Sequence, residues 1–143
     1  MSEGEDSDDT GSVDDEILER IARRLDRSER FATVLRRPDT APNAVVAEYE
    51  TGYFPAGVEQ AALRIRWFET DDFTVHYSEQ YGDGESWECR WDRHPNSHNS
   101  RDHFHPPPDA ATPGADASHP TDWRDVLAEV LTDLDERVRA FWD

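Results

Sequence analysis

The sequence predicts an α+β fold: an antiparallel β-meander sheet of four to five strands, with a long C-terminal helix and an N-terminal helix packed on one face. Two patterns support this. Between residues 31 and 92, apolar side chains alternate with polar ones in several short segments. In residues 122–143 the apolar side chains instead recur every three or four positions, the period of a helix. The sheet face away from the helices is then expected to be polar and open.

The N-terminal helix is expected to begin near residue 13. Ser12 followed by Asp15 is typical of a helix N-cap with an acidic third position, and apolar residues recur at helical spacing from Val13 to Leu25. Residues 1–12 are acidic and rich in serine and glycine. We therefore expect a disordered acidic tail over residues 1–12 and a single α+β domain over residues 13–143.

Several segments should form the strands. Residues 31–35 are β-prone, and residues 43–51, 63–68, 73–78 and 87–92 alternate. Asp71 and Asp72 should turn the chain between the third and fourth of these, and the Gly82-Asp83-Gly84 hairpin should precede the last. Since the side-chain period of a strand is two, the apolar members share one face, which the helices must cover.

A segment without periodicity, residues 93–120, separates the last strand from the C-terminal helix. It is rich in histidine, proline, asparagine and aspartate, and long loops of this kind are usually functional or mobile. Thr121 or Asp122 is expected to cap the helix that follows. The apolar stripe of that helix includes Leu127, Leu131 and Leu134.

The charge is strongly acidic. The formal net charge is −18, and all 15 basic residues are arginine. An acidic, lysine-free surface suits a protein that works in molar salt, where the Debye length falls to about 3 Å and self-repulsion is screened. The hydrophobic fraction of 35% argues against a wholly disordered acidic chain. We therefore expect a halophilic host.

Cysteine content and the terminal sequence bear on the compartment. Cys89 is the one cysteine, which excludes an intramolecular disulfide, and it is expected to be a buried apolar residue rather than a nucleophile. The first residues have neither the basic nor the apolar region of a signal peptide, and no apolar run is long enough to span a membrane. Cytoplasmic localisation is expected, with no membrane contact.

Polar residues of the strands should share the open face of the sheet. Strand alternation sends the following to one side: Arg64, Arg66, His76, Glu88, Arg90 and Asp92. Three arginines in so acidic a protein could bind an anion such as phosphate, because guanidinium donates two parallel hydrogen bonds. The alternative is an ordinary solvated face with arginine–carboxylate pairs across strands.

A histidine-rich segment follows that last strand. Its members are His94, His98, His103 and His105. Histidine can move protons or bind metal near neutral pH, and His103 and His105 would lie on one side of an extended chain, as a metal pair requires. The cysteine ligands of a structural zinc site are absent and the spacing matches no standard site, so we expect no metal and no cofactor. Acid–base catalysis, RNA contacts, or simple hydrogen bonding and packing remain as alternatives.

The strand Arg90-Trp91-Asp92, the histidine segment after it and the terminal Phe141-Trp142 resemble the TumE-type toxin family. Members have a hairpin ending in an Arg-aromatic-Asp-Asn stretch, a His-x-His segment and a helix ending in an aromatic residue. The resemblance covers roughly residues 60–143. The sequence departs from it at Arg93, where the family tends to have asparagine, and in a proline-rich insert over residues 106–120.

The resemblance implies a RelE-like or otherwise RNA-directed toxin, paired with a helix-turn-helix antitoxin, here in a haloarchaeon. One candidate activity is that of a metal-independent endoribonuclease. Catalysis is then assigned to His103, His105, Asp92 and Arg90. Contacts with RNA or phosphate are assigned to Arg64, Arg66, His76, His94 and His98. The alternative is a non-catalytic protein-interaction domain whose open sheet face docks another protein.

We expect the midpoint of thermal unfolding to rise as KCl increases from dilute to molar concentration. Like charges on a surface of net charge −18 repel one another, and added salt screens that repulsion. The midpoint is measured by circular dichroism at each salt concentration. A midpoint that stays constant or falls with salt would contradict the halophilic interpretation.

Overall fold

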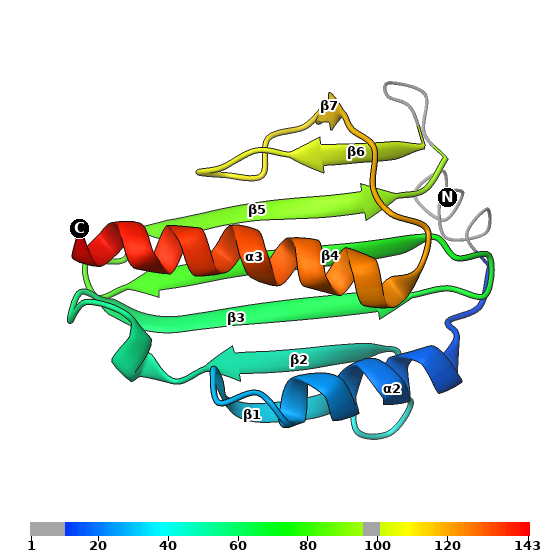
Figure 1. Ribbon diagram of the computed structural model, residues 1–143, viewed down its shortest axis with the longest axis horizontal. Coiled ribbons are helices and arrows are strands. Elements are labelled where there is room, and N and C mark those ends of the chain that lie inside the picture. The colour runs from blue at the N-terminus through cyan, green and yellow to red at the C-terminus, as the bar shows by residue number, and fades with distance from the viewer. Residues whose placement is uncertain (1–10, 96–100) are drawn as a thin grey trace.

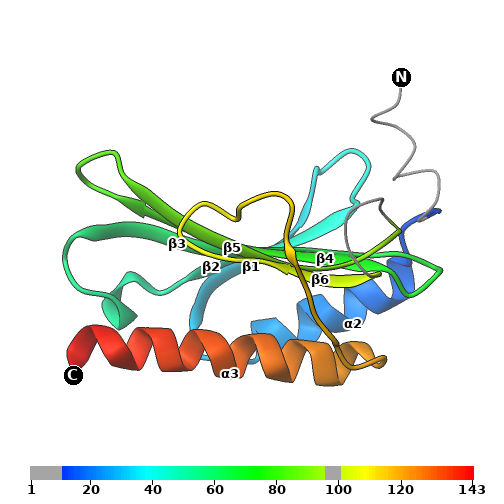
Figure 2. The same ribbon diagram turned by 90° about the horizontal axis from the view of Figure 1, so that it is seen from above.

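The computed structural model describes residues 11–95 and 101–143, which form two layers: a seven-stranded antiparallel sheet and two helices on one of its faces (Figures 1 and 2). The strands lie in chain order, each antiparallel to the next. They are β1 Phe31–Arg37, β2 Ala44–Tyr49, β3 Val58–Trp67, β4 Phe73–Tyr81, β5 Ser86–Arg93, β6 Asp102–His105 and β7 Ala115–Asp116. A short 3-10 helix, η1 Thr51–Tyr53, joins β2 to β3. The predicted fold class is confirmed.

The predicted strand count of four to five is wrong, because β6 and β7 lie in the segment that was expected to be a loop. β6 pairs with β5, and β7 pairs with β6. Their sequences carry no apolar alternation: His103 and His105 face one side of β6, and Asp102 and Phe104 face the other. Backbone pairing with the edge of β5, rather than an apolar face, makes this segment a strand.

Helix α2, Asp15–Asp26, begins later than the N-cap prediction placed it. The cap is Asp14, whose Oδ1 accepts a hydrogen bond from the Ile17 amide at 3.1 Å. Ser12 instead accepts a backbone hydrogen bond from Glu69, and Asp14 donates one to Trp67. The chain before α2 is therefore extended along the end of β3 and cannot yet be helical. Of the predicted tail, residues 1–10 lie outside the described part of the chain.

Helix α3, Trp123–Trp142, begins at Asp122, one of the two predicted caps. The Asp122 side chain accepts a hydrogen bond from the Arg124 amide at 2.8 Å. The buried residues of α3 are Val126, Leu127, Val130, Leu131 and Leu134, and they belong to the same core as the apolar face of β3, β4 and β5. Neither helix of the described chain is long and apolar enough to cross a membrane.

An ion pair buried between α3 and the sheet was not foreseen. Glu79 has no exposed surface, and both of its carboxylate oxygens accept hydrogen bonds from Arg137, each at 2.7 Å. The hydroxyls of Tyr77 and Tyr81 donate to the same carboxylate. The Arg137 guanidinium lies 3.3 Å from the centroid of the Trp87 ring. The carboxylate is thus fully hydrogen-bonded, which is the condition under which a buried charge is tolerated.

We expect Arg137→Ala to lower the free energy of unfolding by about 3 kcal/mol, because it leaves the buried Glu79 carboxylate without its cation. The control is Arg139→Ala, an exposed arginine of the same helix, which should change stability by less than about 0.5 kcal/mol. Urea denaturation of both variants measures the difference. Equal stability of the two variants would show that the ion pair is not needed to hold α3 on the sheet.

Candidate functional site

Two rows of polar side chains cross the sheet on the face away from the helices. The register pairs residues of neighbouring strands directly, so members of a row are side by side. The first row is Arg64, His76, Arg90 and His105. The second row is Arg66, Thr74, Asp92 and His103. The structure therefore brings together most of the site residues predicted from the sequence.

Asp92 lies at the centre of this arrangement and is almost fully buried, with 1% of its surface exposed. Its Oδ1 accepts a hydrogen bond from the Thr74 hydroxyl at 2.6 Å. Its Oδ2 accepts one from Arg90 Nε at 2.8 Å. Thr74 was not among the predicted site residues, although the β3–β4 turn and strand alternation place it on the same face as His76.

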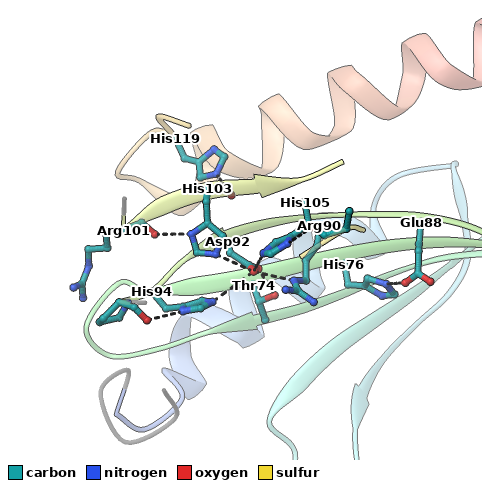
Figure 3. Close-up of polar contacts among 12 residues, drawn as sticks. Thr74, His76, Glu88, Arg90, Asp92, His94, Arg101, His103, His105 and His119 are labelled. Atoms are coloured by element: carbon teal, nitrogen blue, oxygen red, sulfur yellow. Dashed lines mark hydrogen bonds and ion pairs between the residues drawn. The ribbon is translucent and has the colours of Figure 1, made fainter. Parts of the chain in front are cut away.

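Three imidazoles surround the same carboxylate oxygen (Figure 3). The Nε2 atoms lie near Asp92 Oδ2 at 3.5 Å for His94, 3.4 Å for His103 and 3.2 Å for His105. Each Nδ1 donates a hydrogen bond to a backbone carbonyl: His94 to Pro95 at 3.0 Å, His103 to Arg101 at 3.2 Å and His105 to Ala111 at 2.9 Å. Both ring nitrogens of each histidine are thus fixed in direction, and each Nε2 points toward Asp92.

Strand β6 and the chain after it position these imidazoles. β6 sets His103 opposite Asp92 and His105 opposite Arg90. The segment between β6 and β7 then arches over the open face, opposite the helices (Figure 2). Close packing here requires glycine at residue 114, since a Cβ there would lie 2.6 Å from the Phe104 carbonyl oxygen.

The surroundings of Asp92 keep it ionised. Burial by itself would raise the pKa of Asp92, but hydrogen bonding with His103 and His94 and the charge of Arg90 hold that pKa well below its usual range. Burial lowers the pKa of His105, and the positive charge of Arg90 acts in the same direction. Near neutral pH the site therefore contains a carboxylate beside a neutral His105, a pair of groups that can hold a cation.

The more exposed polar residues of the open face differ from the buried group around Asp92. His76 Nε2 lies 2.6 Å from Glu88 Oε1, and about a third of each side chain is exposed. Arg64 next to them is exposed, and within residues 11–95 and 101–143 neither Arg64 nor Arg66 forms an ion pair. Burial and the nearby Arg64 lower the pKa of Arg66. Two adjacent arginines without carboxylate partners can bind an anion, whereas His76 and Glu88 can transfer a proton.

Arg93, the residue that departs from the expected family pattern, faces the helix side of the sheet. Its Nε donates to Asp102 at 2.8 Å, and its guanidinium also donates to the carbonyls of His119 and Pro120. The same group lies 4.9 Å from the centroid of the Phe73 ring. Arg93 therefore fastens the chain between β7 and α3 to the sheet and does not belong to the site. His98, also predicted as a contact, lies outside the described residues.

Comparison with known proteins places the chain in a family. A family model described as Toxin TumE matches residues 16–138, which include every strand and most of both helices. No curated protein and no solved structure gives a match.

We expect Cys89 to be unreactive toward thiol reagents at pH 8 in the folded protein. The side chain is buried in the core, and burial raises the pKa of its thiol to about 12, so the reactive thiolate is scarce. Release of chromophore from a disulfide reagent measures the rate with and without denaturant. Reaction of the native chain as fast as the unfolded one would show that Cys89 is accessible and restore it as a candidate nucleophile.

Proposed function

The chain belongs to the TumE toxin family, and from this membership we propose that it is the toxin of a toxin–antitoxin pair and acts on RNA. RNA is proposed as the substrate because Arg64 and Arg66 lie on the open face next to the His76–Glu88 pair. RNA offers a phosphate to the first pair and a ribose 2′-hydroxyl to the second. Phosphate contacts from arginine are the usual basis of affinity for nucleic acid.

The proposed reaction is cleavage of the RNA backbone. Glu88 lies at His76 Nε2 and would hold a proton there, which leaves the Nδ1 lone pair to take the proton of a ribose 2′-hydroxyl. The 2′-oxygen attacks the adjacent phosphorus, the bond from that phosphorus to the 5′-oxygen of the next nucleotide breaks, and the 5′-oxygen takes a proton from water. Arg64, Arg66 and Arg90 would stabilise the negative charge that develops on the phosphate.

The buried histidines fit a positioning role better than a catalytic one. His103 and His105 are 2% and 4% exposed, so a nucleotide cannot reach them as it can reach His76. They contact Asp92, which in turn holds Arg90 Nε. Catalysis by His103 and His105 stays a prediction, and we propose instead that with Asp92 they orient Arg90. His94, with 22% of its side chain exposed, and His98 remain candidate RNA contacts.

The proposed setting is the cytoplasm of a halophilic archaeon, with residues 13–143 as one domain. A net charge of −18 repels RNA in dilute buffer, and molar salt would screen that repulsion. The same salt weakens phosphate contacts, so hydrogen-bond geometry and not total charge would carry recognition. We propose a helix-turn-helix antitoxin as the partner that neutralises the toxin.

Growth arrest and RNA cleavage test the proposal. The chain is induced in an expression host without its neighbouring genes, and RNA from the cells is examined for cleavage. We expect arrest by the parent, and we expect His76→Ala to lower the cleavage rate roughly 10²- to 10⁴-fold, since general base catalysis is lost. Arg64→Ala with Arg66→Ala should weaken RNA binding.

Arg124→Ala, an exposed arginine at the start of α3, is the control and should arrest growth like the parent. Circular dichroism checks that each variant folds. If the parent arrests growth but His76→Ala and the double arginine variant remain as toxic, the RNA site is elsewhere. If the parent neither arrests growth nor binds RNA, the protein-interaction alternative is preferred.

A further inference from the structure

Three imidazoles point toward the buried carboxylate of Asp92 (Figure 3). Asp92, His103 and His105 are buried and offer ligand atoms that all lie within 4.8 Å of one another. His94 lies outside this group of mutually close atoms, but its Nε2 approaches Asp92 Oδ2 to 3.5 Å. Side chains from the end of β5, from β6 and from the residue after β5 thus direct three imidazole nitrogens toward one carboxylate oxygen.

The three distances from the imidazole nitrogens to Asp92 Oδ2 match the ligand separations of a tetrahedral metal site. Metal–nitrogen and metal–oxygen bonds of about 2.0–2.1 Å at tetrahedral angles put the ligand atoms about 3.3–3.4 Å apart. The three Nε2 atoms lie 3.5, 3.4 and 3.2 Å from Asp92 Oδ2. Hydrogen bonds between an imidazole and a carboxylate are normally shorter, with donor and acceptor about 2.7–2.9 Å apart when either is charged.

The hydrogen bonds on the far side of each ring decide which nitrogen carries a proton. A carbonyl oxygen only accepts, so each Nδ1 that bonds to one must hold a hydrogen. If every Nε2 were protonated as well, three imidazolium cations and Arg90 would surround one carboxylate. His105 Nε2 is buried and forms no hydrogen bond within the described residues. With the ring proton on Nδ1, each neutral ring would offer an Nε2 lone pair to a cation that replaces a proton between it and Asp92 Oδ2.

We propose that Asp92 Oδ2 and the Nε2 atoms of His94, His103 and His105 bind one divalent transition-metal ion, with Zn²⁺ as the expected ion. Three imidazoles and one carboxylate suit zinc better than Mg²⁺ or Ca²⁺, which prefer oxygen ligands. This departs from the expectation of a chain without metal. The sequence indicated only the His103 and His105 pair, because the other ligands meet them across strands: Asp92 lies opposite His103, and the His94 amide donates a hydrogen bond to the Arg101 carbonyl.

The neighbours of the cluster have the arrangement found around metal ligands. Metal-binding histidines usually donate the second ring N–H to a carbonyl or carboxylate, which fixes the ring, and all three do so here. Thr74 donates to Oδ1 of Asp92, and Arg90 donates to one lone pair of Oδ2, which leaves the other for the metal. The ion would tie β6 to β5 and hold Arg90 through Asp92. The inference goes beyond the proposed function and does not depend on RNA.

Metal titration of the protein alone tests the site. The untagged full-length chain is stripped with EDTA, dialysed and titrated with ZnCl₂ by calorimetry and with CoCl₂ by visible spectroscopy. We expect one ion per chain, the visible bands of tetrahedral cobalt, and a rise in the thermal midpoint with zinc. His105→Gln and Asp92→Asn should each weaken zinc binding at least about 100-fold, because each removes a ligand.

His119→Gln is the matched control. His119 lies beside the cluster, with Nε2 at 3.1 Å from the His103 carbonyl, but offers it no ligand atom, so this variant should bind zinc like the parent. Binding well below one ion per chain, or equal zinc affinity in His105→Gln and the parent, would overturn the proposal. The Asp92 carboxylate would then be neutralised by protonated side chains and not by a metal ion. Because no RNA is present, failure of the metal site and failure of the RNA activity are read separately.

Discussion

The pairing of β6 with β5 is the interaction on which the candidate site depends. It places His103 opposite Asp92 and His105 opposite Arg90, and it carries the chain back so that the segment before β7 covers the open face. A shift of this register by one residue would turn both histidines to the helix side, since successive side chains of a strand face opposite ways. The cluster around Asp92 would then not exist.

Each face of the sheet buries a carboxylate, and the two carboxylates have different surroundings. On the helix face the buried Glu79 carboxylate is matched by Arg137 and two tyrosine hydroxyls, so that all of its acceptors are used. On the open face Asp92 is equally buried, but its Oδ2 is approached by four nitrogen atoms, more than the two lone pairs of that oxygen can accept from. The first arrangement stabilises the fold, and the second has the character of a ligand site.

The open face of the sheet has an exposed half and a buried half. Arg64 on β3, His76 on β4 and Glu88 on β5 contact solvent, whereas Asp92 is enclosed by β6 and the chain after it. A division between a rigid support and an accessible surface is common where a group must be held in orientation for chemistry. Arg90 links the two halves, because it lies in the row of His76 and bonds to Asp92.

Local periodicity determined much of this protein from the sequence alone: the α+β class, both helices, the first five strands and the shared face of Arg64, Arg66, His76, Arg90 and Asp92. These features are predictable because a strand repeats its side-chain direction every two residues and a helix every three to four, and both periods are visible in the local spacing of apolar residues. The strand β6, the Asp14 cap and the Glu79–Arg137 pair were decided only in three dimensions. Each depends on a contact between backbone or charged groups of segments that are far apart in the sequence. Such contacts leave no periodic pattern along the chain.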